Sequence, residues 1–191
     1  PKLNQNQEIV IRNSFGSNNL FTNFTSFKGS SGKFRFYSYF NFKQGDGFRK
    51  NSFFNSKNFF LKTIYDFSKK SKLSFDLTYF TYLTQQAGGL NDTMFALDPF
   101  QSNRKRNWFS VDWLLYNLTF NHDFRPNKSF SINLFGLNAK RYALGFRVNR
   151  VDQIDSNGPR DLIYGDFKNM GLETKFLNNY KLFQKESIFV L

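Results

Sequence analysis

The stretch KLSFDLTYFTYLTQQ, residues 72–86, decides the fold class because its side chains change character from one residue to the next. One phase of the alternation carries Leu73, Phe75, Leu77, Tyr79 and Leu83. The other phase carries Ser74, Asp76, Thr78, Phe80 and Tyr82. A period of two places successive side chains on opposite faces of a β-strand. The stretch therefore predicts a strand with one apolar face and one mixed face.

The same alternation recurs on both sides of this stretch. It predicts strands over roughly 8–15, 20–28, 33–43, 57–67, 72–86, 108–124, 129–144 and 166–177, with an unfinished strand from Glu186. No segment repeats its apolar residues with the period of 3.6 that marks a helix. We therefore expect an all-β chain.

The predicted connections alternate between short and long. Tight turns are expected at 29–32, 68–71, 125–128 and around 178–179, and long polar loops at about 44–56, 87–107 and 146–165. Strands with short turns at one end and long loops at the other are typical of an antiparallel up-and-down transmembrane β-barrel of an outer membrane. About 9–11 tilted residues suffice to cross the hydrocarbon layer, and the predicted strands reach that length.

The composition fits a sheet with one apolar and one wet face. The chain has 191 residues, 28 of them Phe, and 20% are aromatic, yet the mean hydropathy is −0.54. No run of about 18 apolar residues exists, which excludes a transmembrane helix. The predicted location is therefore the outer membrane, crossed by strands.

The chain is strongly basic, with a net charge of +13 and a pI near 9.9. Such a charge suits phosphorylated lipid, anionic solutes or nucleic acid. A soluble basic β-protein that holds single-stranded nucleic acid on aromatic platforms is one alternative, but its aromatics should gather on a few strands. Here they follow one phase along strand after strand, so we expect lipid and no nucleic acid as a partner.

Residues that carry enzymatic chemistry are scarce. The chain has a single histidine, His122, and no cysteine, so Cys/His dyads, Ser-His-Asp triads and His-based metal sites find no support. The triplet Gly45-Asp46-Gly47 lacks the Gly-Lys-Ser/Thr of a phosphate loop. We expect a protein that is not an enzyme and has no resident metal or cofactor.

Several motifs resemble a known family. QQAGGLND at residues 85–92, DP at 98–99, QSNR at 101–104 and RNWF at 106–109 are similar to a loop region of TonB-dependent outer-membrane receptors, closest to the ferric-citrate type of iron transporter. GDGFR at 45–49, FGL at 135–137 and YKLF at 180–183 agree with it. PKLN at 1–4 resembles the segment that follows the family's N-terminal plug domain.

The resemblance implies a part of a larger barrel of about 22 strands. On this interpretation residues 1–7 form the plug-to-barrel junction and residues 8–191 form 8–9 strands of the barrel, with the plug and the remaining strands absent. The resemblance further implies import of an iron chelate, ferric citrate or a siderophore, driven by the partner TonB through the plug, with iron carried only as cargo. A generic outer-membrane porin or adhesin barrel remains the alternative.

Basic and amide side chains in and near the long loops are the candidate ligand contacts. Arginine forks bind carboxylates in a bidentate manner, which suits an anionic chelate. The predicted ligand-binding set is Gln85, Gln86, Asn103, Arg104, Arg106, Arg141, Arg147 and Arg150. Contact of these residues with lipopolysaccharide phosphates is the alternative.

Overall fold

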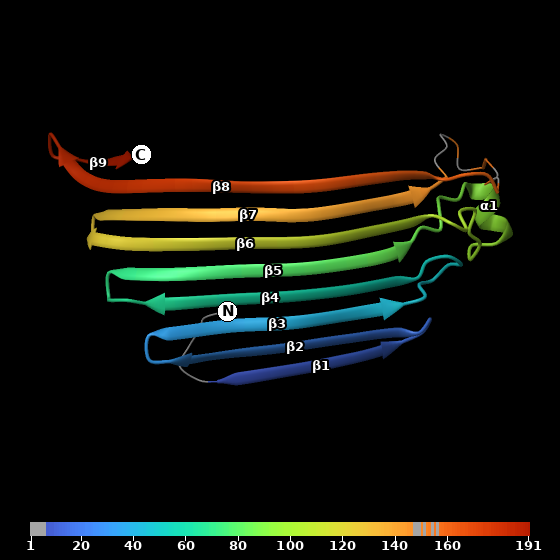
Figure 1. Cartoon of the computed structure of the whole chain (residues 1–191), viewed down its shortest axis with the longest axis horizontal. Coiled ribbons are helices and arrows are strands. Elements are labelled where there is room, and N and C mark those ends of the chain that lie inside the picture. The colour runs from blue at the N-terminus through green and yellow to red at the C-terminus, as the bar shows by residue number, and fades with distance from the viewer. Residues whose placement is uncertain (1–6, 147–149, 151, 154, 156) are drawn as a thin grey trace.

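The computed structural model describes residues 7–146, 150, 152, 153, 155 and 157–191. Within them the chain forms one nine-stranded antiparallel sheet, in which each strand pairs with its neighbour in sequence (Figure 1). The strands are β1 (Glu8–Gly16), β2 (Leu20–Ser31), β3 (Phe34–Gly45), β4 (Phe54–Asp66), β5 (Ser71–Gln85), β6 (Trp108–Arg125), β7 (Lys128–Gly145), β8 (Asp161–Leu182) and β9 (Lys185–Val190). The sheet is an open meander, and β1 and β9 are its edges.

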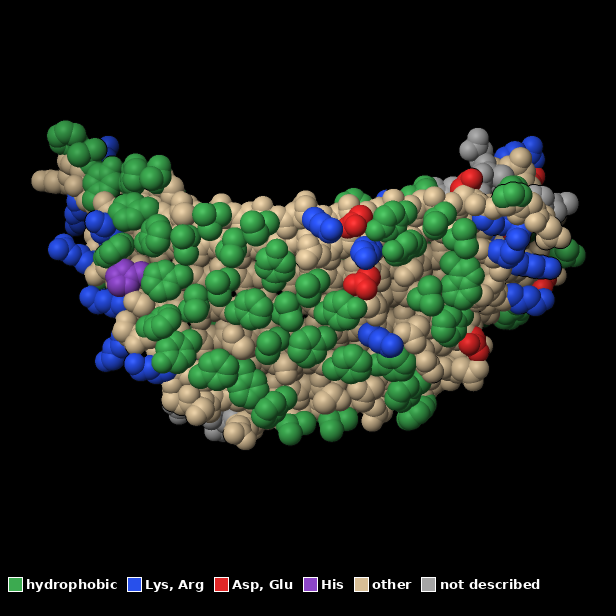
Figure 2. All heavy atoms as spheres, in the orientation of Figure 1, with side chains coloured by type: hydrophobic (Ala, Val, Ile, Leu, Met, Phe, Trp, Pro, Cys, Tyr) green, Lys and Arg blue, Asp and Glu red, His purple; other side chains and the backbone are tan. Residues whose placement is uncertain are grey.

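The strand register joins the alternating phases into two continuous faces. Phe75 lies opposite Leu118, and Asp76 lies opposite Asn117; directly opposed residues of antiparallel strands share a face. The apolar face carries Phe36, Phe40, Phe59, Leu61, Phe75, Leu77, Tyr79, Leu114, Tyr116, Leu118, Phe120, Ile132, Leu134 and Leu172. The mixed face carries Tyr39, Phe60, Lys62, Asp76, Thr78, Phe80, Tyr82, Trp113, Asn117, Asn133 and Phe135. Hydrophobic side chains are spread along the whole length of the face shown in Figure 2, with a few charged side chains among them.

The sheet is a single layer and has almost no core. Among the described residues only two hydrophobic side chains are buried, Val111 at 5% exposure and Ala139 at 4%. Leu172 on the apolar face is 66% exposed. A sheet of an ordinary soluble domain buries one face against a second layer. The apolar face of this sheet has no such cover within the chain.

The two ends of the sheet differ. At one end β2–β3, β4–β5, β6–β7 and β8–β9 are joined by tight turns, and at the other end lie the connections 46–53, 86–107 and 146–160 (Figure 1). The β1–β2 turn also lies at the second end but is short, with Asn18 and Asn19 at φ of 56° and 55°. The one helix of the described residues, α1 (Asp92–Leu97), is in the connection 86–107. No helix in the described part of the chain has the length and apolar character needed to span a membrane.

The predicted fold class is confirmed, and one predicted turn is wrong. The chain does not turn at 178–179: β8 continues to Leu182, and the turn lies at Phe183 and Gln184, with φ of 48° and 65°. Hydrogen bonds between Asn179 and Asn127, each 2.7 Å, keep this part of the chain extended beside the β6–β7 turn. The strands β4 and β8 also begin earlier than predicted, so their preceding loops are shorter.

Candidate functional site

The three long connections at one end of the sheet pack against one another. Arg49, from the connection 46–53, donates from Nε and Nη2 to the carbonyl of Gln101 at 3.0 and 2.8 Å, and from Nη1 to the carbonyl of Gly88 at 2.7 Å. The backbone N–H of Lys50 donates to Phe100 O at 2.9 Å. One arginine therefore ties the connection 46–53 to two separate points of the connection 86–107.

The connection 86–107 is an ordered, self-supporting segment. Its short helix α1 begins after Asn91, whose side chain accepts from the Met94 N–H at 2.9 Å and so caps the helix. Gly88 has φ of 79°, and a Cβ there would lie 2.2 Å from Asn103 Oδ1. Only glycine fits this close approach in a left-handed conformation. The close approach to Asn103 and the positive φ therefore explain why the first glycine of the QQAGGLND motif, Gly88, is a glycine.

Arg104 joins this segment to the connection 146–160. Its side chain is buried, at 5% exposure, and Nη1 donates to Gln153 O at 3.0 Å and to Asn103 O at 2.7 Å. The Arg104 guanidinium lies 5.3 Å from the Phe146 ring, and the Arg160 guanidinium lies 5.6 Å from the same ring. Arg160 also forms a buried ion pair with Asp155. Arg104 is therefore occupied in holding the loops together.

The other predicted loop residues lie either at the end of β5 or exposed on the long connections. Gln85 and Gln86 lie where β5 ends, and their backbone N–H groups donate to Phe53 O and Asn107 O at 2.8 and 2.9 Å. Arg106 is exposed and donates to Gly158 O at 3.0 Å. Arg150 is exposed and pairs with Asp152 at 2.6 Å. This hydrogen bond lowers the pKa of the Asp152 carboxyl below its ordinary value.

The structure brings Asn103 and Arg106 to one cavity. A hollow of about 420 Å³ lies between the connections 86–107 and 146–160, and its lining includes Ser102, Asn103, Lys105, Arg106, Gln153 and Arg160. Asp152 and Asp155 also line it, and these carboxylates pair with Arg150 and Arg160. The predicted residue Arg141 lies apart from this cavity, on the mixed face of β7, and Arg147 lies outside the described residues.

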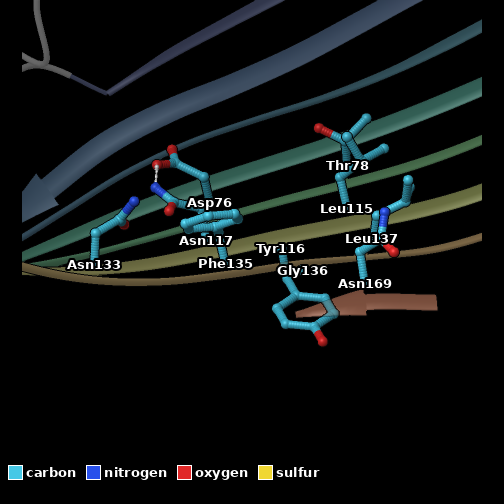
Figure 3. Close-up of a pocket in the computed structure, with 10 residues that line it drawn as sticks. All are labelled: Asp76, Thr78, Leu115, Tyr116, Asn117, Asn133, Phe135, Gly136, Leu137 and Asn169. Atoms are coloured by element: carbon cyan, nitrogen blue, oxygen red, sulfur yellow. Dashed lines mark hydrogen bonds between the residues drawn. The ribbon is translucent and has the colours of Figure 1, made fainter. Parts of the chain in front are cut away.

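A second cavity, which sequence reasoning missed, opens on the mixed face of the sheet. It measures about 450 Å³, and its lining includes Asp76, Thr78, Leu115, Asn117, Asn133 and Phe135 (Figure 3). Tyr116 points to the opposite side of the sheet, where its hydroxyl lies over Gly136 (Figure 3). Glycine within a strand marks such close approaches, which gives Gly136 of the FGL motif a local structural reason.

Ion pairs and hydrogen bonds connect the polar side chains around the second cavity. Lys62 Nζ lies 2.6 Å from Asp76 Oδ1, and Asn117 Nδ2 donates to Asp76 Oδ2 at 3.5 Å. Thr119 Oγ1 donates to Asn133 Oδ1 at 2.8 Å. The polar residues of the mixed face thus satisfy one another in this region, as groups in a confined, partly desolvated place require.

The described residues contain no cluster of three or more His, Cys, Asp or Glu side chains that could hold a metal ion. His122 lies at the tight-turn end, where its Nδ1 is 2.7 Å from Ser71 Oγ and its ring packs edge-on against Phe124. Its contacts are those of a structural residue.

The fold matches part of a known transporter. A crystal structure of the ferric citrate transporter FecA in its unliganded form superposes with a TM-score of 0.75 and 18% sequence identity, over 87% of this chain and 24% of that chain. No protein-family model and no curated protein sequence matches the chain. The likeness shows the fold, and this chain spans about a quarter of the length of the transporter that it matches.

Proposed function

We propose that the chain is part of the barrel wall of a TonB-dependent outer-membrane transporter that imports an anionic iron chelate, ferric citrate or a siderophore complex. The observation that carries the proposal is the single-layer antiparallel sheet, which has one apolar face and has its long basic connections at one end only. The likeness of this fold to part of FecA supports the proposal. The family motifs at 85–109 in the connection 86–107 support it.

The apolar face supports the membrane location. Leu118 and Leu172 are exposed on it, and water contact costs about 25 cal/mol per Å² of apolar surface. Hydrocarbon would remove that cost, because a barrel satisfies its backbone groups between strands and needs no second layer. The mixed face then turns toward the interior of the barrel.

The long connections support capture of an anionic ligand on the outer side. In this proposal the cavity between 86–107 and 146–160 contributes Asn103 and Arg106 to the ligand, and Arg104 acts by holding the two connections in place. Arg141 and Arg150 supply further cationic groups, and lipopolysaccharide phosphates are the natural neighbours of lysines on the outer surface. The chain supplies no chemical step and no resident cofactor, since the iron is cargo.

Transport assays on the gene product that contains this segment test the proposal. Uptake of radiolabelled ferric citrate or ferric siderophore by cells should require both this gene and TonB, and should stop when the proton gradient is collapsed. A porin barrel would instead conduct small solutes in planar bilayers without TonB. Uptake that is unchanged after deletion of the gene, for every chelate tried, would contradict the transporter proposal.

A further inference from the structure

Basic side chains gather at the tight-turn end of the sheet, at the left in Figure 2. Every tight turn carries or adjoins at least one of them, such as Lys33 between β2 and β3 and Lys69 between β4 and β5. The set, which we call the basic rim, comprises Lys33, Lys69, Lys70, Lys72, Arg125, Lys128, Lys181 and Lys185. All of these side chains are exposed except that of Lys128, which is half-buried.

The basic rim has no counter-ions of its own. No described carboxylate lies within ion-pair distance of any of its residues. Two carboxylates at this end, those of Glu8 and Asp66, pair instead with Lys28 and Arg35, at 2.6 and 2.7 Å. The remaining charged side chains of the described residues near this end are Asp123, Glu173, Lys175 and Glu186. The tight-turn end therefore carries an excess of positive charge that the chain leaves uncompensated.

Aromatic rings lie directly beside the basic rim. Lys128 Nζ lies 5.6 Å from the centre of the Phe124 ring and 5.2 Å from that of the Phe176 ring. Lys33 Nζ donates to the carbonyl of Phe67 at 2.9 Å, and the Phe67 side chain is 49% exposed. A girdle of aromatic rings is typical of the level at which a transmembrane barrel meets lipid headgroups. Lysines beside such rings extend their ammonium groups toward the polar layer.

A line of charged side chains crosses the apolar face at the other border of its apolar band (Figure 2). This charged row comprises Lys57, Asp112, Lys140, Asp166 and Lys168. From Asp112 to His122 at the tight-turn end, β6 extends about 33 Å at about 3.3 Å per residue. A strand tilt of about 40° reduces this length to a height of about 25 Å, the height of the apolar band of a transmembrane barrel. The charged row and the basic rim therefore lie at the two headgroup levels of one bilayer.

We infer that the basic rim binds the phosphodiester groups of anionic phospholipids, such as phosphatidylglycerol, in the membrane leaflet at the tight-turn end. At headgroup level the cations of the rim meet lipid phosphates. A zwitterionic lipid brings its own cation with its phosphate, whereas an anionic lipid brings an uncompensated negative charge that basic residues near the surface attract. This inference rests on the membrane location in the proposed function, and it adds a lipid partner that does not depend on the cargo.

Site-specific quenching in vesicles that contain the full-length gene product tests the inference. The one reactive cysteine, at Ser68 in the β4–β5 turn, carries a fluorophore. The phosphatidylcholine vesicles contain a minor fraction of phosphatidylglycerol or phosphatidylcholine with a nitroxide on the acyl chain near the headgroup. Quenching should show phosphatidylglycerol enriched about fivefold over its bulk fraction, the factor that about one cation near an anionic surface contributes. The enrichment should be lost at about 1 M salt, where the screening length is about 3 Å.

Matched variants remove the same charge from the two borders of the apolar band. The rim variant carries Lys69→Gln, Lys70→Gln and Lys128→Gln. The control variant carries Lys57→Gln, Lys140→Gln and Lys168→Gln. The rim variant should lose the enrichment at Ser68, and the control variant should keep it, because the charged row lies across about 25 Å of hydrocarbon. Far-UV circular dichroism shows whether both variants retain their β-structure.

Three results overturn the inference and leave the proposed function standing. One is equal quenching by the two labelled lipids. Another is enrichment that the rim variant retains or that the control variant loses to the same extent. The third is binding of soluble polyphosphate to the rim in place of phosphatidylglycerol, because the rim would then serve a soluble polyanion. Failure of the full-length gene product to insert into vesicles would instead overturn the membrane location in the proposed function itself.

Discussion

Replacing Arg49 should loosen the connection 86–107 without disturbing the sheet. The Arg49 guanidinium makes three hydrogen bonds of 3.0 Å or shorter to the carbonyls of Gln101 and Gly88. A hydrogen bond contributes about 0.5–1.5 kcal/mol net, and more when one partner is charged. Because Arg49 is only half-buried, water can replace part of these hydrogen bonds. We therefore expect Arg49→Gln to lower the free energy of local opening of the connection 86–107 by about 2–3 kcal/mol.

Hydrogen–deuterium exchange measures this cost directly. A tenfold change in an equilibrium corresponds to about 1.4 kcal/mol, so amides of the connection 86–107 should exchange roughly 30- to 140-fold faster in Arg49→Gln. Lys50→Gln removes the same charge one residue later, from a side chain that is 75% exposed and 3.9 Å from Asp98. Peptides of β5 and β6 should be unaffected in both variants.

The reasoning would be refuted by equal exchange in the two variants. If Arg49→Gln and Lys50→Gln differ by less than twofold over 86–107, the three carbonyl contacts do not hold the loop. Faster exchange throughout β3 and β4 would also contradict the account, because it would place the role of Arg49 in the sheet.

Three further outcomes follow from the structure. In the full-length gene product, Leu118→Arg puts a cation on the apolar face. If the position is near the bilayer midplane, this change should lower the folding free energy in lipid by about 2–4 kcal/mol. The control Thr119→Arg, on the mixed face, should cost less than half as much in the same denaturant titration. Gly88→Ala forces a Cβ into a position with φ of 79° and should cost about 1–3 kcal/mol of loop closure, seen as faster amide exchange. Arg150 lowers the pKa of Asp152, so their contact is complete above the ordinary carboxyl pKa and is lost as pH falls through the lowered value; Arg150→Gln should raise the Asp152 midpoint in an NMR titration.

Much of the fold could be predicted because strand periodicity is a local property. Alternation over 72–86 assigns each residue to a face before any partner strand is known, and the register then places Phe75 with Leu118 and Asp76 with Asn117. The start of β4 escaped prediction because 54–57 reads as polar loop, although these residues pair with both neighbouring strands. The strand end at Leu182 depends on Asn127, which lies 52 residues from its partner Asn179.

The candidate site was less predictable because it depends on contacts between distant loops. Arg104 belongs to a basic run. Nothing nearby in the sequence shows that its guanidinium is buried and donates a hydrogen bond to the carbonyl of Gln153, 49 residues away. The contacts of the Phe146 ring with the guanidinium groups of Arg104 and Arg160 likewise exist only in the folded chain. The aromatic residues of the mixed face were visible in the sequence, but only the strand register shows which of them lie side by side.

Site-directed spin labelling tests the central claim, that the apolar face contacts lipid and the mixed face does not. The chain has no cysteine, so single cysteines can be placed without background from this segment in the full-length gene product reconstituted into liposomes. The positions to label on β6 are Leu114, Leu115, Tyr116, Asn117, Leu118 and Thr119. We predict that labels at the even-numbered positions are relaxed chiefly by oxygen, which partitions into lipid, and that labels at the odd-numbered positions are shielded from it. Accessibility without a period of two, or equal access of a water-soluble nickel chelate to both faces, would contradict the account.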